Sequence, residues 1–284
     1  MHLLAAQPGG FSDDEGIIDL AQTPADIVIL SAADSSLAAL AGGAELLDED
    51  FPSIRLANWM QLLKPAAFDL YQDKVLDHAQ VVVVSLLGGA SYWQYGFSRL
   101  QDWLANSRPS RPRQLIIVPG DDTEDAALFA ASSVDENSAK LVWRFLREGG
   151  QHNISHFYHY LAEQFFAPDD ARYQWRLPQT LPNALIYMPA NLYQEQLGQS
   201  QSSQSQHSQS KHSQHVSLKD WQQRWQLLAQ AEQTVQAEQH NHKHKQNKQS
   251  GVCSGVCIVL FYRSHLQSDN TAMFDGLIEQ VRRN

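Results

Sequence analysis

The run Val81–Leu86, VVVVSL, constrains the fold of this chain more than any other segment. It opens with four consecutive valines, and polar residues do not alternate with them. This pattern is typical of a strand that is buried on both faces. Such a strand needs neighbours in a parallel sheet and helices over both faces of that sheet. The run therefore predicts an α/β domain.

Other strands and helices are expected to alternate around this run. Ile27–Leu30 and Leu115–Val118 are apolar runs of strand length, and Ile54–Ala57 is a weaker one. Asp34 or Ser35 is expected to cap the helix that follows the first of them. The remaining expected elements are strands at His2–Ala6 and Leu185–Met188 and helices at Ala66–Ala79, Tyr92–Ala105, Glu124–Ala131, Glu136–Glu148 and Asn153–Phe166. This order predicts a doubly wound, mostly parallel sheet with added helices.

The composition changes after about residue 193. From Gln194 to Ser250 the chain is rich in Gln, Ser and His, and such sequence buries too little apolar surface to become ordered. A helix at 217–232 interrupts this region, and Cys257–Tyr262 and Thr271–Arg283 then read as a strand and its following helix. We therefore expect an α/β domain at 1–192, a disordered low-complexity region at 193–255 and the first strand-helix unit of a truncated second domain at 256–284.

Charge and composition exclude several classes of protein. The formal net charge is −10, and no basic stripe is present, which argues against a nucleic-acid partner. No apolar run approaches the length of a membrane span, and the N-terminus lacks the positive region of a signal peptide. The two cysteines, Cys253 and Cys257, do not make a disulfide framework. These features predict a soluble cytoplasmic protein without a membrane partner.

Six segments, in a fixed order along the chain, resemble one family. They are RLANWMQL at Arg55–Leu62, VVVSLLGGASYWQYG at Val82–Gly96, VPGDD at Val118–Asp122, ALIYMPA at Ala184–Ala190, DWQQRW at Asp220–Trp225 and LFYRSHLQSDNTAMFDGLIE at Leu260–Glu279. The series resembles the N-terminal part of the large, CobN-type subunit of cobaltochelatase. That subunit is related to the porphyrin-binding subunit of magnesium chelatase.

The resemblance implies ATP-dependent insertion of Co²⁺ into hydrogenobyrinic acid a,c-diamide, a corrin-type tetrapyrrole, in aerobic cobalamin biosynthesis. Co²⁺ is then the substrate metal of a metal-inserting ligase. ATP and Mg²⁺ belong to AAA+ ATPase partner subunits, and the chain indeed has no GxxxxGK[ST] loop. Family members are several-fold longer, so this chain looks truncated and is expected to be inactive alone. The expected partners are the ATPase, the associated chelatase subunits and the corrinoid substrate.

Substrate-binding residues are expected where strands end, because ligands of open α/β sheets bind beyond the carboxyl ends of the strands. Gly88 and Gly89 would let a ligand approach the backbone, and Tyr92 and Trp93 would offer ring faces to a flat macrocycle. The alternative is a tight turn followed by a helix that faces the core. The catalytic residues are unknown, because no Ser-His-Asp order, His-Glu-x-x-His or dinucleotide fingerprint is present.

Arg263 and His265 follow the last expected strand and are a second substrate-binding candidate. An arginine and a histidine there could meet a propionate or acetamide side chain of the ring. The alternative is that Asp269 or Asn270 only caps the next helix.

The remaining candidates are acidic and histidine-rich motifs. Asp121 and Asp122 are expected to cap a helix, with a cation or ligand amide as the alternative. His152, His156 and His159 share a helix face and could bind a divalent metal, but surface or half-buried histidines without a metal are favoured.

His240, His242 and His244 are the candidate metal-binding residues of the polar region. Drift of a low-complexity tract is the alternative, and the interleaved lysines oppose cation binding. If the tract does bind metal, the chain could instead be a metal-binding adaptor. The chain could also be a magnesium-chelatase-like porphyrin-binding fragment or the remnant of a broken gene.

Overall fold

The computed structural model describes residues 17–110, 112–182, 185–189, 214–216, 218–219, 221–223, 258–268 and 270–283. The chain forms two compact units. The first comprises Met1–Thr180 together with Ser264–Asn270, and the second comprises Leu181–Arg263 together with Thr271–Asn284. The predicted domain boundaries near 192 and 255 lie outside the described residues and stay predictions.

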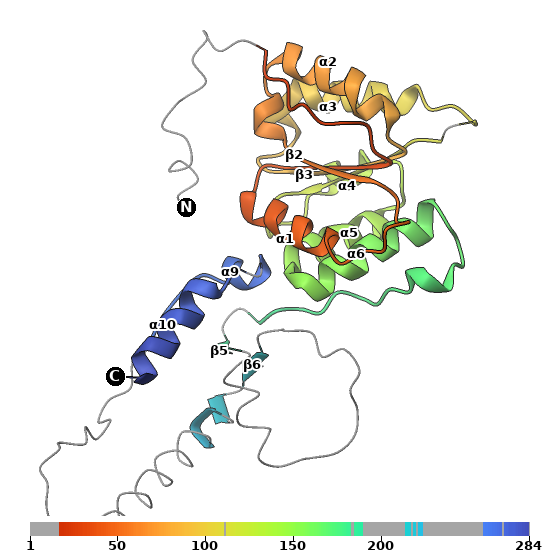
Figure 1. Ribbon diagram of the computed structural model, residues 1–284. Coiled ribbons are helices and arrows are strands. Elements are labelled where there is room, and N and C mark those ends of the chain that lie inside the picture. The colour runs from red at the N-terminus through yellow and green to blue at the C-terminus, as the bar shows by residue number, and fades with distance from the viewer. Residues whose placement is uncertain are drawn as a thin grey trace, which may run out of the picture. The chain divides into compact units, whose positions relative to one another are not determined.

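Four parallel strands form the sheet of the first unit (Figure 1). They are β1 (Ile27–Ser31), β2 (Ile54–Asn58), β3 (Val81–Leu86) and β4 (Gln114–Pro119), in the spatial order β2-β1-β3-β4. Every residue of β1 is buried, as are five of the six residues of β3, the strand that the valine run predicted. The doubly wound α/β fold is therefore confirmed.

Helices cover both faces of this sheet, and Figure 1 shows the three layers. One face packs against α2 (Pro65–Lys74) and α3 (Gln94–Ala105). The other packs against α1 (Asp34–Ala44), α5 (Glu136–Glu148) and α6 (Gly150–Phe165). The short α4 (Ala126–Ala130) follows β4, and the 3₁₀ turns are η2 (Trp59–Leu62), η3 (Leu76–His78), η4 (Ala90–Trp93) and η5 (Ala171–Tyr173).

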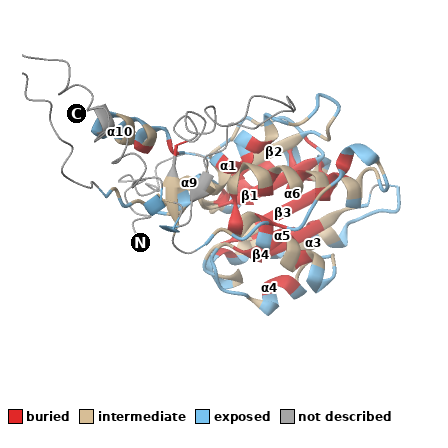
Figure 2. Ribbon diagram, turned by 90° about the horizontal axis from the view of Figure 1, so that it is seen from below, coloured by how far each residue is buried: buried red, intermediate tan, exposed pale blue. Residues whose placement is uncertain are grey.

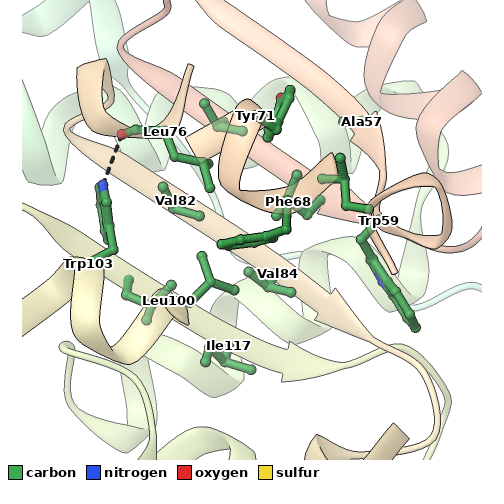
Figure 3. Packing of buried hydrophobic residues seen from close by; sticks show 14 of the residues in the cluster. Ala57, Trp59, Phe68, Tyr71, Leu76, Val82, Val84, Leu100, Trp103 and Ile117 are labelled. Carbon is green, nitrogen blue, oxygen red and sulfur yellow. Dashed lines mark hydrogen bonds between the residues drawn. The ribbon is translucent and has the colours of Figure 1, made fainter. Parts of the chain in front are cut away.

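Alternate residues of each strand supply the two halves of the core, which is the buried centre in Figure 2. Val82 and Val84 lie in the half beneath α2 and α3, with Phe68 and Trp103 (Figure 3). The indole Nε1 of Trp103 donates a 2.9 Å hydrogen bond to the carbonyl oxygen of Leu76, so its polar atom is satisfied inside the core.

Side chains bind the backbone at both edge strands of the sheet. At β4, the hydroxyl of Ser132 accepts a 2.9 Å hydrogen bond from the backbone N–H of Ile117, and the hydroxyl of Ser133 accepts another from Leu115. At β2, Gln22 Nε2 donates a 2.8 Å hydrogen bond to the carbonyl oxygen of Leu56. These contacts occupy backbone groups to which a further strand would otherwise bind.

Several predicted helix boundaries were wrong for local reasons. The helix expected at 66–79 ends at Lys74 and continues as η3, and the one expected from Tyr92 begins at Gln94 because η4 precedes it. α6 begins at Gly150, directly after Gly149, whose φ of +57° interrupts the helical backbone. Neither Asp34 nor Ser35 is the N-cap of α1, because Ala33 occupies that position and makes no side-chain cap.

The second unit contains short elements. β5 (Ile186–Met188) pairs antiparallel with β6 (Gln214–Val216), and α10 (Ala272–Arg283) matches the helix predicted near the C-terminus. The strand predicted at 257–262 was wrong for its described residues, because 258–262 belong to no strand. A strand needs a hydrogen-bonded neighbour, which sequence patterning alone does not provide. The strand predicted at 2–6 lies outside the described residues.

The described helices are too short or too polar to cross a lipid bilayer.

Candidate functional site

The candidate site is the edge of the first unit at which the four strands end. Ser31 of β1 lies opposite Asn58 of β2 and Ser85 of β3, and Ser85 lies opposite Val118 of β4. Three of these four positions are polar, whereas the rows before them are mostly apolar. The four strands thus end at the same level of the sheet, and polar side chains lie at this edge.

The strand order places a topological switch point between β1 and β3. The connection after β1 runs through α1 on one face, and the connection after β3 runs through α3 on the other. Ligands of open α/β sheets bind beyond the carboxyl ends of the strands at such a point. The segments that follow β1 and β3, which contain Asp34 and Gly88-Gly89, are therefore the best-placed binding segments.

Asp34 and Asn58 lie together at this edge. The side-chain amide of Asn58 donates a 3.0 Å hydrogen bond to Asp34 Oδ1, and Asn58 Oδ1 accepts one from the backbone N–H of Met60. Asp34 is exposed and stands in the first turn of α1, where the helix dipole stabilises a carboxylate. The Asn58 contact was not foreseen, although each of the first two strands visibly ends in a polar residue.

Gly88 and Gly89 form the turn after β3. Their φ angles are +84° and +76°, which residues with a Cβ adopt rarely. A Cβ on Gly88 would lie 3.3 Å from the ring of Tyr92, whereas one on Gly89 would meet only Asp125 Oδ2 at 4.0 Å. The turn therefore requires glycine at both positions, and the backbone beside Gly89 is uncrowded.

Tyr92 and Trp93 differ in what they present. The Tyr92 side chain is 58% exposed and packs edge-on against Trp59, with ring centroids 6.0 Å apart. Trp93 is only 2% exposed, stacks on Trp59 at 5.1 Å and donates from Nε1 to the carbonyl oxygen of Leu62. Tyr92 is the accessible ring of this turn, and Trp93 belongs to the core that holds Tyr92 in place.

The loop after β4 approaches the Gly88 turn closely. The backbone N–H of Gly120 donates a 3.0 Å hydrogen bond to the carbonyl oxygen of Leu86, and a Cβ on Gly120 would lie 2.9 Å from the nitrogen of Leu87. Only a residue without a side chain fits there. The two loops are thereby held side by side.

The predicted capping by Asp121 and Asp122 was wrong in detail. Asp121 Oδ1 accepts a hydrogen bond from the N–H of Thr123, so it closes a local turn. The N-cap of α4 is Asp125, whose Oδ1 accepts hydrogen bonds from the backbone N–H groups of Ala127 and Leu128. Asp125 directly precedes the helix-forming run AALFA, which is the signal that could have identified it.

The edge is therefore acidic and rich in hydrogen-bond acceptors. Its carboxylates suit cations and the N–H groups of amides better than anions. Among the residues that the structure describes, no three His, Cys, Asp or Glu side chains converge to hold a metal ion. Tyr92 adds an exposed aromatic ring to this edge.

The histidines of α6 lie elsewhere in the first unit. The rings of His152 and His156 meet edge-to-face, with centroids 4.4 Å apart, and His159 Nδ1 lies 3.1 Å from the carbonyl oxygen of Gln174. Desolvation, followed by the positive charges that His152, His159 and Arg176 can carry, lowers the pKa of His156 to about 4. All three rings are half-buried.

The second pair of predicted substrate-binding residues is divided between the units. His265 lies in α9 (Ser264–Gln267) of the first unit, which packs against α1 and α6. Arg263 belongs to the second unit, where its Nη1 donates a 3.0 Å hydrogen bond to the carbonyl oxygen of Leu181. Their binding role stays a prediction.

Several predicted positions lie outside the described residues and stay predictions. They are the metal candidates His240, His242 and His244, the cysteines Cys253 and Cys257, and the capping candidate Asp269.

Comparison with known proteins gives consistent matches. The family model described as CobN/Magnesium Chelatase matches residues 143–284. The chain is 38% identical over 281 residues, or 99% of its length, to the aerobic cobaltochelatase subunit CobN of Pseudomonas aeruginosa. It is also 38% identical over 162 residues, or 57% of its length, to the protein of the same name from a Sinorhizobium species.

One solved structure is also similar, the catalytic subunit of cobaltochelatase from Mycobacterium tuberculosis. The match has a TM-score of 0.42 and 23% sequence identity, and it covers 57% of this chain and 12% of that one. The present chain spans 18% of the length of the Pseudomonas relative and 12% of the Sinorhizobium relative.

Proposed function

The chain belongs to the CobN/magnesium chelatase family, and from this premise we propose that it is the N-terminal portion of a cobaltochelatase large subunit. The observation that carries the proposal is the 38% identity to a CobN subunit over 99% of this chain. The proposed reaction is the ATP-dependent insertion of Co²⁺ into hydrogenobyrinic acid a,c-diamide during cobalamin biosynthesis. Co²⁺ is the substrate metal, and AAA+ partner subunits bind Mg²⁺ and ATP and hydrolyse the ATP.

Within that reaction, the proposed role of this chain is to bind the corrinoid at the strand-end edge. The ring of Tyr92 is exposed enough to stack on a flat macrocycle. Asp34, Asn58 and Asp125 offer oxygen acceptors to the amide side chains of the ring. Gly88 and Gly89 form the turn with positive φ angles, and the backbone beside Gly89 is uncrowded. Trp93 supports Tyr92 from within the core through Trp59.

Two assays with the purified full chain test this proposal. In the first assay, the absorbance of the corrinoid reports binding, and we expect the chain to bind hydrogenobyrinic acid a,c-diamide. In the second, we expect the chain alone to insert no cobalt. Tyr92→Ala should weaken binding about two- to tenfold, because an aromatic contact contributes about 0.5–1.5 kcal/mol.

The matched control is Leu177→Ala, which removes another exposed apolar side chain from the first unit. Equal weakening by both substitutions would remove the assigned role of Tyr92. Cobalt insertion by the chain without partner subunits would contradict its expected inactivity alone.

A second candidate function is binding of a porphyrin, as in a magnesium-chelatase-like fragment. The matching family model spans both kinds of chelatase, which is the observation that favours it. Competition between protoporphyrin IX and the corrinoid for the same chain discriminates the two. Preference for the porphyrin would replace the cobaltochelatase assignment.

A further inference from the structure

An apolar segment of the second unit is exposed in an unusual way. Ile258, Leu260 and Tyr262 are 76%, 90% and 76% exposed, while Val259 and Phe261 between them are half-buried. Residues that alternate in this way point to opposite sides of an extended chain. The sequence IVLFY is typical of a strand buried in a sheet, yet 258–262 pair with no described strand.

The inner side of this segment has a partner in α10. The ring of Phe261 stacks on Phe274, with centroids 4.0 Å apart, and Phe274 is only 7% exposed. Tyr187 of β5 packs edge-on against Phe261, and its hydroxyl donates a 2.5 Å hydrogen bond to Asp275. The segment and α10 are thus held together as a strand-like element and its helix.

The apolar face of α10 extends beyond Phe274, and this further part is exposed. Met273, Leu277 and Val281 are 69%, 45% and 43% exposed and follow one another at a spacing of four residues. This spacing places them along one stripe of the helix. Phe274 lies beside this stripe on the same face of the helix, so the apolar face of α10 is wider than the part that Phe261 covers. Together with Ile258, Leu260 and Tyr262, the stripe indicates a surface that another body covers.

Resting on the proposed function, we propose that this surface docks the rest of the large subunit. We define the docking surface as Ile258, Leu260, Tyr262, Met273, Leu277 and Val281. The segment 258–262 would add as a strand to an α/β sheet of that part, and the stripe of α10 would pack over the sheet face. Backbone hydrogen bonds would provide affinity, and the alternating side chains would fix the register.

The relatives indicate this occupant. The Pseudomonas CobN subunit aligns with 99% of this chain, yet the chain amounts to only 18% of that relative, so most of the relative lies outside the match. The family match at residues 143–284 includes the whole docking surface. A second copy of this chain fits less well, because two copies that each carry a net charge of −10 repel one another.

Titration of the full 284-residue chain with a second polypeptide tests the proposal. That polypeptide is the part of the Pseudomonas CobN subunit that this chain does not match, and binding is measured by isothermal calorimetry. We expect a one-to-one complex. Leu260→Glu and Leu277→Glu should each weaken it at least tenfold, because each buries a charge in the apolar contact.

Leu177→Glu is the matched control, because Leu177 is a 63% exposed leucine of the first unit, and it should leave binding unchanged. Circular dichroism checks that each variant keeps its helical content. Hydrogen–deuterium exchange should show protection of 258–262 on binding.

Two outcomes would overturn the docking surface. One is undiminished binding by both the Leu260 and Leu277 variants. The other is a dimer of the chain alone that Leu260→Glu dissociates, which would assign the surface to a second copy. Failure of corrinoid binding with this complex intact would refute the proposed function and leave the docking surface in place.

Discussion

Two adjacent glycines of α1 show how strongly single positions depend on their neighbours. A Cβ on Gly42 would meet nothing within 4 Å, whereas one on Gly43 would lie 2.4 Å from Ile154 Cγ2 of α6. We expect Gly42→Ala to raise the free energy of unfolding by about 0.5–1 kcal/mol, because alanine is the better helix former. Gly43→Ala should lower it by about 1–3 kcal/mol through overpacking.

Urea unfolding followed by circular dichroism measures both changes. The two variants serve as controls for each other, since they make the same chemical change one residue apart. Stabilisation by both would mean that α1 and α6 can move apart without cost.

His156 should make the stability of the protein depend on pH. Its folded pKa is about 4, whereas an unfolded histidine has a pKa of about 6.5. Between these values the unfolded chain binds the proton and the folded chain does not, so stability is complete above about pH 6.5 and falls toward pH 4.

The expected loss is about 1–2 kcal/mol, after a reduction for the solvent that still reaches the partly buried ring. His156→Leu should lack this contribution when the free energy of unfolding is compared at about pH 7 and about pH 4.5. Desolvation of the ring is the main effect that opposes protonation of His156, and the positive charges of His152, His159 and Arg176 add to it. An unchanged pH dependence in the variant would assign the effect to other groups.

At the scale of elements, the edge of β4 depends on two serines. The hydroxyl of Ser132 both accepts from the N–H of Ile117 and donates to its carbonyl oxygen, at 2.9 and 3.2 Å, and Ser133 accepts from Leu115. We expect the double substitution Ser132→Ala, Ser133→Ala to lower the free energy of unfolding by about 1–3 kcal/mol.

Light scattering should also show increased aggregation of this variant, because unpaired edge groups bind other chains. Ser98→Ala, an exposed serine of α3, is the control. A double variant that is as stable and as soluble as this control would show that water replaces the serines.

The elements that sequence predicted best are those whose patterning is local and strong. The valine run of β3 and the periodic pattern of α5 carry enough information in their own residues. Ile258–Tyr262 has the same kind of pattern as β3 but no described partner strand, and pairing is a non-local property. Asp121 was mistaken for a cap because an aspartate can close a turn or cap a helix, and the difference depends on backbone geometry.

The candidate site was predictable in part for the same reason. The Gly88-Gly89 turn follows from the strand before it, and the structure gives both glycines positive φ angles. Which of Tyr92 and Trp93 faces outward depends on η4, whose 3₁₀ geometry turns Trp93 onto Trp59. Residue types alone could not predict which of the two rings is exposed, nor the hydrogen bond between Asp34 and Asn58.

At the scale of the whole molecule, the two compact units should unfold separately. Ile116 is fully buried in the first unit, and Phe274 is the buried ring of α10 in the second. We expect Ile116→Ala to cost about 2–5 kcal/mol in the first unit alone and Phe274→Ala about 3–5 kcal/mol in the second alone.

Hydrogen–deuterium exchange in increasing urea measures the free energy of unfolding of both units in one sample. Each substitution serves as the control for the other. A single transition that both substitutions shift equally would mean that the chain unfolds as one cooperative body.

The side chains that bind the two edge strands also limit how strands can be added to this sheet in evolution. Gln22 occupies the outer edge of β2, and Ser132 and Ser133 occupy that of β4. A new strand at either side would first have to displace these contacts, so widening the sheet carries an energetic penalty from the first step. We therefore expect evolutionary enlargement in this family to proceed in series, by added folding units along the chain. The same four strand ends would then persist as a fixed platform, whatever is attached beyond them.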